Sequence, residues 1–114
     1  MHLLNMDNPP IFLAVAGFAQ FNPHYVNALA PFKQRIADKD IIIVSADTEE
    51  IQLNVLSRGL SSANIGQNPF EMGRLSTKLM HNYILYNKKP AQSHYYTDFH
   101  YCTQSNASKC TVNH

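Results

Sequence analysis

The sequence predicts an α/β fold, a three-layer sandwich in which helices cover both faces of a mostly parallel sheet. Short apolar or β-branched runs alternate with segments whose apolar residues recur at helical spacing, in the order strand, helix, strand, helix, strand, helix, strand. Right-handed crossovers are expected between the parallel strands. The chain has 114 residues, of which 45% are hydrophobic and 15% charged, and this suits a single folded domain.

The first predicted strand is Ile11–Gly17, a continuous apolar run that is typical of a strand buried on both faces. A helix is expected to begin at Asn22, because Asn is a favourable N-cap and Pro23 supplies a preset φ at the first helical position. Pro31 lies inside the apolar stripe of this helix and should kink or split it near Ala30.

The second strand is predicted at Ile41–Ala46, where four β-branched residues follow one another. Asp47 is then expected to cap a helix, with Glu50 three residues later as its capping-box partner. Gly59 suits the left-handed position that ends such a helix. A third strand is predicted at Ser61–Gly66.

The third helix has the best-specified start in the chain. Asn68 and Pro69 repeat the Asn-Pro pattern, and Glu71 lies three residues after Asn68, as a capping box requires. Apolar residues then continue at helical spacing to about Leu85.

Ser93–Thr103 alternates between two sets of residues with period two and is rich in aromatics, which predicts a last strand, half-buried or at a sheet edge. The polar tail 104–114 is expected to be loose. Cys102 and Cys110 have a spacing that fits neither a zinc knuckle nor a redox C-x-x-C motif. A short-loop disulfide and two free thiols remain as alternatives.

Polar side chains stand where consecutive strands give way to helices. Asp47 and Gln67 follow the second and third strands, and Gln20 and Asn22 follow the first. In a parallel sheet these junctions meet at the carboxyl edge, where ligands bind. A carboxylate with an amide suits the hydroxyls of a neutral polyol better than an anion. The alternative is that Asp47 only caps its helix and Gln67 lies on the surface.

Several function classes find no support. A net charge of +1 predicts no strong attraction to nucleic acid or anionic lipid. The chain has no G-x-S-x-G, G-x-G-x-x-G or P-loop motif, and its six histidines show no metal-ligand spacing. We therefore expect no enzyme, no cofactor and no metal site. The N-terminus lacks the features of a signal peptide, which predicts either a cytoplasmic protein or a piece of a larger chain.

The stretch VSADTEEIQLNVLSRGLSSANIGQNPFEMG, residues 44–73, is similar to the C-terminal part of the type I periplasmic sugar-binding proteins. The same module is the effector-binding domain of lactose-repressor-type regulators. In that family one strand ends in an Asp that contacts the sugar, and the next ends in a Gln followed by a Pro and a Met-Gly pair. The resemblance covers Pro10 to about Thr103, and the matching residues are Asp47, Gly59, Gln67, Pro69, Met72 and Gly73.

The resemblance implies a periplasmic-binding-protein-like lobe that is only partly present. Residues 1–114 would form one α/β domain, the C-terminal portion of a two-lobe sugar-binding domain, with 9–67 in one lobe and 68–103 packing on the absent lobe. Asp47 and Gln67 would hydrogen-bond sugar hydroxyls. Asn22 falls where the family commonly has an Asn-Asp pair, although no acid matches here.

The function implied is monosaccharide binding by the solute-binding protein of an ABC-type uptake system, which would contact a membrane permease through the full-length protein. The alternative is the effector-binding domain of a regulator. The cysteine pair resembles the exported members, where it can close a terminal disulfide, and this favours a periplasmic over a cytoplasmic location. No direct contact with nucleic acid is expected. A piece with uncovered apolar faces should self-associate or swap domains.

Overall fold

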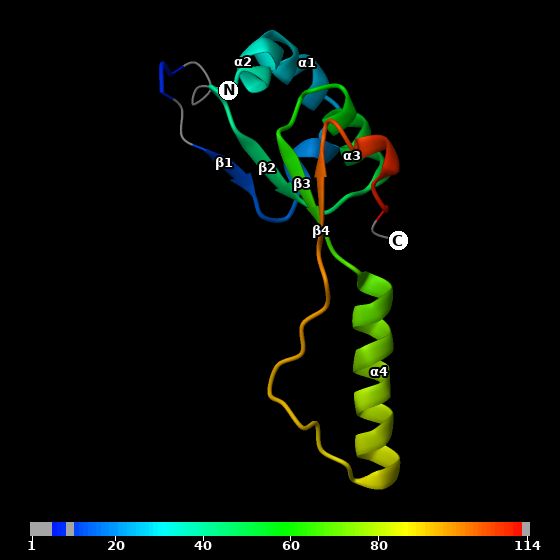
Figure 1. Ribbon diagram of the computed structural model, residues 1–114. Coiled ribbons are helices and arrows are strands. Elements are labelled where there is room, and N and C mark those ends of the chain that lie inside the picture. Colours follow the sequence, from blue (N-terminus) through cyan, green and yellow to red (C-terminus); the bar gives the residue numbers. More distant parts are fainter. Residues whose placement is uncertain (1–5, 9–10, 113–114) are drawn as a thin grey trace.

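The computed structural model describes residues 6–8 and 11–112 and shows a small α/β body from which a long arm projects (Figure 1). Its radius of gyration is 18.0 Å and its principal extents are 59 × 26 × 23 Å. A compact chain of this length would have a radius of gyration of about 13 Å. A substantial part of the chain therefore lies outside the core of the body.

The body is built on a four-stranded sheet whose spatial order equals the chain order. Its strands are β1 (Phe12–Ala14), β2 (Ile43–Ala46), β3 (Ala63–Gly66) and β4 (His100–Thr103). The first three are parallel, and β4 runs antiparallel to β3. The predicted α/β class with a mostly parallel sheet is thus confirmed.

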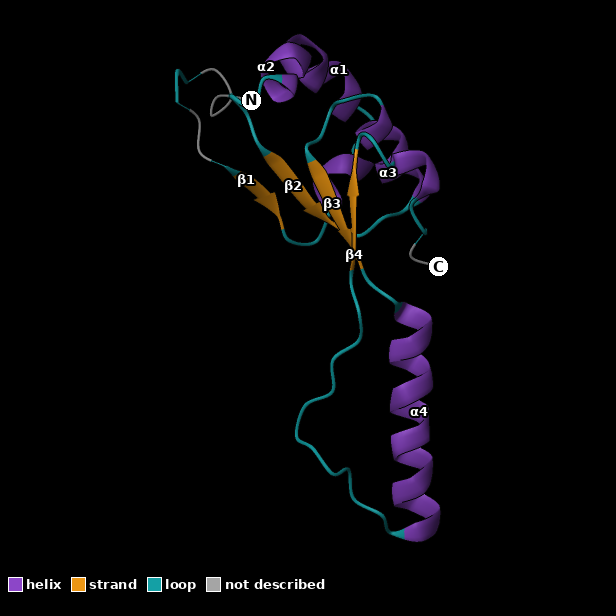
Figure 2. Ribbon diagram, viewed as in Figure 1, coloured by secondary structure: helices purple, strands orange, loops and turns teal. Residues whose placement is uncertain are grey.

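The helices of the body connect these strands and lie on one side of the sheet (Figure 2). The first connection holds α1 (Tyr25–Leu29), a 3-10 turn (Ala30–Phe32) and α2 (Lys33–Ala37), and the second holds α3 (Glu50–Ser57). The expected split at Pro31 is confirmed, because the α-helix gives way to the 3-10 turn there.

The main core fills the space between the sheet and these helices. The β2 residue Ile43 points into it and is 3% exposed. Gly59, with φ 76°, ends α3 as expected and lets the chain turn back to β3. The buried residues of this core are Tyr25, Leu29, Ile36, Ile41, Ile43, Val55 and Leu60.

The opposite face of the sheet carries no helix among the described residues. Leu13 is 60% exposed and Tyr101 is 68% exposed. The expectation of three layers, with β1 buried on both faces, is therefore wrong for the part of the chain described here, which has two. We call this surface the open face; the register of the strands places on it Leu13, Val44, Ala46, Ala63, Ile65, Tyr101 and Thr103.

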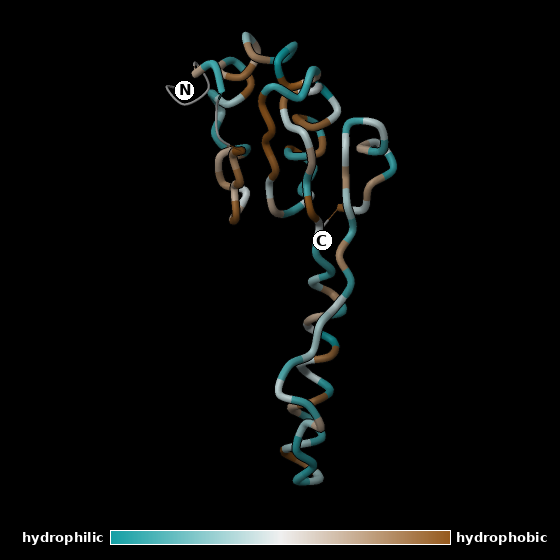
Figure 3. The backbone as a smooth tube through the Cα atoms, turned by 60° about the vertical axis from the view of Figure 1, so that its left-hand side comes forward, coloured by the Kyte–Doolittle hydropathy of each residue, from teal (hydrophilic) through white to brown (hydrophobic). Residues whose placement is uncertain are grey.

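The arm consists of α4 (Pro69–Tyr86) and a return segment, residues 87–99. The Asn68 side chain accepts a hydrogen bond from the backbone N–H of Glu71 (3.0 Å), which confirms the predicted cap. The Glu71 carboxylate pairs with Arg74 instead of closing a capping box. No residue of α4 is buried, and hydrophobic positions recur along the arm (Figure 3). In the described ranges, no helix combines the length and apolar character needed to cross a bilayer.

The last strand is shorter than predicted, since only His100–Thr103 of the expected Ser93–Thr103 pairs with β3. The register explains the difference. Gly66 is the last residue of β3, and its partner is His100. Residues before His100 therefore run past the end of β3 and have no strand to pair with, although their sequence alternates.

The tail is not loose as far as residue 112. A 3-10 turn at Ala107–Lys109 follows β4, and a disulfide joins Cys102 to Cys110. The Thr111 carbonyl lies 2.8 Å from Nε2 of His100 and accepts a hydrogen bond from the Thr48 hydroxyl (2.9 Å). Of the two alternatives for the cysteines, the structure has the disulfide.

Candidate functional site

Asp47 and Gln67 meet at the carboxyl edge of the sheet. They follow directly on β2 and β3, whose register pairs Ala46 with Ile65. Nε2 of Gln67 donates a hydrogen bond of 2.7 Å to Oδ1 of Asp47, and both residues are half-buried. The predicted proximity of these two side chains is confirmed, and their contact with a sugar stays a prediction.

The backbone of Asp47 adopts a left-handed conformation, with φ 73°. Asn and Asp tolerate this region better than most residues. Its N–H donates to the carbonyl of Ile65 (2.8 Å), and its carbonyl accepts from Nδ2 of Asn64 (2.8 Å). Two hydrogen bonds to β3 thus fix the position from which the carboxylate extends.

The expectation that Asp47 caps the following helix is wrong. The N-cap of α3 is Glu49, whose side chain accepts from the N3 backbone, while Gln52 accepts from the Glu49 N–H (3.0 Å). The turn at Asp47 redirects the chain and shifts the helix start by two residues. The Asp47 carboxylate points to Gln67 rather than to the helix end.

Gln20 lies inside the body rather than on the surface at the carboxyl edge of the sheet, since it is 1% exposed. Its carbonyl oxygen accepts from Nε2 of Gln52 (3.0 Å) and Nδ2 of Asn64 (2.9 Å), and its own amide donates to Asn64 (3.3 Å). Gln52 also donates to the Ala46 carbonyl (2.8 Å). We call these three residues the amide trio. It supports the strand ends from behind, because it bonds the backbone of both Ala46 and Asp47.

Asn22 is exposed at the first strand-to-helix junction, and its side chain accepts from the backbone N–H of His24 (2.9 Å). This bond stabilises a turn that precedes α1. The first helix accordingly begins at Tyr25, and the expected start at Asn22 is wrong. Asn22 serves local turn structure, as Asn commonly does.

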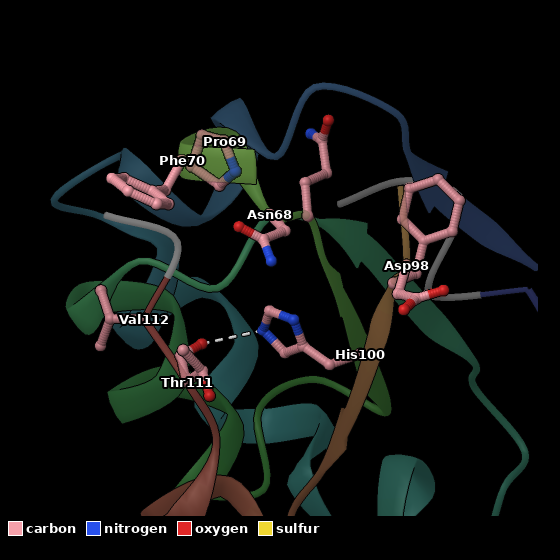
Figure 4. Close-up of a pocket in the computed structure, with 9 residues that line it drawn as sticks. Asn68, Pro69, Phe70, Asp98, His100, Thr111 and Val112 are labelled. Carbon is pink, nitrogen blue, oxygen red and sulfur yellow. Dashed lines mark hydrogen bonds between the residues drawn. The ribbon is translucent and has the colours of Figure 1, made fainter. Parts of the chain in front are cut away.

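A pocket of about 680 Å³ adjoins Gln67 at the base of the arm (Figure 4). The side chains of Asn68 and His100 face one another across it. The sequence does not predict this pocket, because Thr111 and Val112 of the tail, which was expected to be loose, form one of its walls. Its lining combines amide, carboxylate and imidazole groups with two phenylalanine rings: Gln67, Asn68, Pro69, Phe70, Asp98, Phe99, His100, Thr111 and Val112.

The arrangement suits hydrogen bonding rather than metal binding. Among residues 6–8 and 11–112, no three His, Cys, Asp or Glu side chains group closely enough to hold a metal ion. Carboxylate and amide oxygens accept from hydroxyls, and amide N–H groups donate to them. Aromatic rings beside such groups add apolar contact area. The edge and the pocket can therefore exchange hydrogen bonds with hydroxyl groups.

Comparison with models of protein families finds no match to this chain, and comparison with curated proteins finds none either.

Proposed function

We propose that this chain is a carbohydrate-binding module that binds a neutral monosaccharide and catalyses no reaction. The observation that carries the proposal is the hydrogen bond between Gln67 and Asp47 at the ends of two adjacent parallel strands. This edge is where open α/β sheets bind their ligands.

The chemistry of the pair favours a neutral ligand. A sugar hydroxyl can donate to the Asp47 carboxylate and accept from the Gln67 amide, so that a vicinal pair of hydroxyls replaces the hydrogen bond that the two side chains make with each other. A phosphate or carboxylate would be repelled by Asp47. The pocket beside Gln67 offers room for the rest of the ring.

We further propose that the module is the C-terminal portion of a type I periplasmic sugar-binding protein of an ABC-type uptake system. The open face and the arm support this, because both leave apolar surface uncovered where the remainder of a two-lobe domain would pack. The disulfide supports an oxidising compartment, and hence the transport protein over a cytoplasmic regulator of the lactose-repressor type.

Ligand-observed NMR on this chain tests the binding proposal, with neutral pentoses and hexoses compared against sugar phosphates and sugar acids. One lobe supplies only part of the contacts, so we expect dissociation constants of about 1 mM or weaker. Saturation transfer to a neutral sugar should disappear in Asp47→Asn and in Gln67→Ala. Asn tolerates the left-handed conformation of Asp47, so Asp47→Asn removes the charge without straining the turn.

A matched control is available on α2, where Gln34 donates a hydrogen bond of 3.0 Å to Asp38 on the exposed surface. This pair has the same chemistry away from the strand ends, and Gln34→Ala should leave sugar binding unchanged. Equal binding of anionic and neutral sugars, or equal loss of binding in Gln34→Ala and Gln67→Ala, would overturn the proposal. So would the absence of saturation transfer to every sugar.

A further inference from the structure

We propose that a second copy of this chain covers the open face, with the arm of each copy lying on the sheet of the other. This inference concerns the 114-residue chain by itself, in which the second copy takes the surface that the remainder of a two-lobe domain would cover in a longer protein. Apart from Phe70, which also lines the pocket beside Gln67, it uses the side of the sheet opposite α1–α3 and not the strand ends. It commits to one occupant, a second identical chain.

The area left uncovered matches what such a contact requires. The chain exposes 8067 Å². A compact monomer of 12.9 kDa would expose about 6,300 Å² by the usual scaling with mass. The excess of about 1,800 Å² falls within the roughly 1,000–2,500 Å² that each partner buries in an obligate dimer.

The open face has the composition of a layer that is meant to be covered. The strand register places five aliphatic side chains, one tyrosine and one threonine on it and no charged residue. Helices normally cover both faces of a parallel sheet. In the described part of this chain no layer covers this face, and Leu13 and Tyr101 are therefore each more than half exposed.

The arm presents the complementary surface: its helix α4 carries apolar residues and packs on no sheet of the described chain, and none of its residues is buried. Met72, Leu75 and Leu79 lie on the side of α4 that faces the return segment, with which they line a hollow. A second row lies on another side of the helix, since its members are three or four residues apart. We call it the outer row; it consists of Phe70, Gly73, Thr77, Met80 and Ile84.

The outer row is exposed and unhindered. Phe70 is 80% exposed, Met80 58% and Ile84 68%. A Cβ at Gly73 would meet no atom within 4 Å, so the middle of the row is open to close approach. The 18 residues of α4 span about 27 Å, which is longer than the roughly 14 Å width of four strands. The helix can therefore cross the whole sheet of a partner.

The open face and the outer row can be covered together in a reciprocal dimer. Each copy offers one sheet and one helix, so two copies related by a two-fold axis satisfy both at once and form a closed dimer. Neither charge repulsion between copies nor a charged residue on the open face opposes this, since the net charge is only +1.

Sedimentation velocity measures the assembly directly. At about 100 µM, well above the micromolar dissociation constants of weak interfaces of this size, the chain should sediment with twice the mass of the 12.9 kDa monomer. Leu13→Arg on the open face and Ile84→Arg on the outer row should each give a monomer. Both side chains are mostly exposed, so the fold should tolerate the change, and circular dichroism checks this. Asn27→Arg, on the exposed surface of α1, adds the same charge and should remain dimeric.

Mixing the two monomeric variants distinguishes arm-on-sheet contact from other dimers. The Leu13→Arg copy keeps an intact arm and the Ile84→Arg copy an intact sheet, so the mixture should form a heterodimer with one intact contact. A monomeric wild-type chain at 100 µM would overturn the proposal and assign the surface to a different occupant. A dimer that Ile84→Arg leaves intact, or a mixture that stays monomeric, would overturn the reciprocal arrangement.

Discussion

Nε2 of Gln67 lies 2.7 Å from Oδ1 of Asp47, across the ends of two adjacent parallel strands. The two residues are 20 positions apart in sequence and are brought together by the register that pairs Ala46 with Ile65. Behind them the amide trio bonds the backbone carbonyls of Ala46 and Asp47. The strand ends that carry the pair are thus held by buried groups that lie behind them.

The amide trio should contribute strongly to stability. Gln20→Ala removes the oxygen to which both Gln52 and Asn64 donate, leaving two buried amides short of a partner. We expect the free energy of unfolding to fall by about 2–4 kcal/mol. Urea unfolding measures this, with Gln34→Ala as the exposed control, expected within about 0.5 kcal/mol of the wild type. Equal stabilities of the two variants would contradict the role given to the trio.

Gly66 is required because the ring of His100 packs against it. A Cβ at position 66 would lie 1.9 Å from Nε2 of His100, the atom that bonds to the tail at Thr111. Gly66→Ala should therefore displace the ring and cost about 1–3 kcal/mol in urea unfolding. In a His100→Ala background the ring is absent, and the same substitution should cost much less. Additive effects of the two changes would show that the ring is not the obstacle.

The disulfide closes a loop with a sequence separation of 8 residues between Cys102 and Cys110. Loop-closure entropy for so short a loop predicts a stabilisation of about 2–3 kcal/mol. It also holds the buried Ala107 against Leu53 and Leu56 of α3. Cys102→Ala with Cys110→Ala should lower the thermal midpoint by at least as much as reduction of the wild type. No change on reduction would mean that the tail holds its place without the bond.

Tyr25 makes the stability of the body depend on pH in the alkaline range. Burial raises the pKa of Tyr25 from 10.0 to about 12, an increase that its hydrogen bond with Gln20 only partly offsets. The folded state holds this proton more tightly than the unfolded state, so its contribution is complete below pH 10 and declines as the pH rises toward 12. The full decline is about 2–3 kcal/mol.

Urea unfolding at several pH values across this range tests the role of Tyr25, with Tyr25→Phe as the comparison. The variant loses the hydrogen bond from the Tyr25 hydroxyl to the Leu60 carbonyl (2.9 Å) and should be less stable at neutral pH. Its stability should then fall less steeply above pH 10 than that of the wild type. Parallel pH curves for the two proteins would refute the assignment.

Local sequence signals predicted the elements whose boundaries are set locally. The N-cap at Asn68 was predicted because a short polar side chain can accept from the backbone of the first helical turn. The end of α3 at Gly59 was predicted because glycine adopts a positive φ without strain. The approach of Gln67 to Asp47 was found because adjacent parallel strands end at one edge. The break at Pro31 was found because its ring cannot continue a helix.

Features that depend on distant partners were missed. Alternation before His100 resembled a strand, but whether a segment pairs depends on where β3 ends. Gln20 was expected at the carboxyl edge because it follows the first strand. Its burial depends on hydrogen bonds from Gln52 and Asn64, which are distant in sequence and could not be foreseen. A signal was present for Gln52, which lies among the apolar residues Leu53, Val55 and Leu56 of α3, since a buried amide needs partners.

The most direct measurement is a titration of the ¹⁵N-labelled chain with the neutral sugar that gives the strongest saturation transfer, followed by ¹H–¹⁵N correlation spectra. The side-chain N–H signals of Gln67 report on the site directly, because this amide donates to Asp47 in the unliganded protein and would lose that bond to a sugar hydroxyl. We predict saturable shifts that are largest for this side-chain amide and for the backbone N–H groups of Asp47 and Thr48. Saturable binding that leaves the Gln67 side-chain amide unmoved would contradict it.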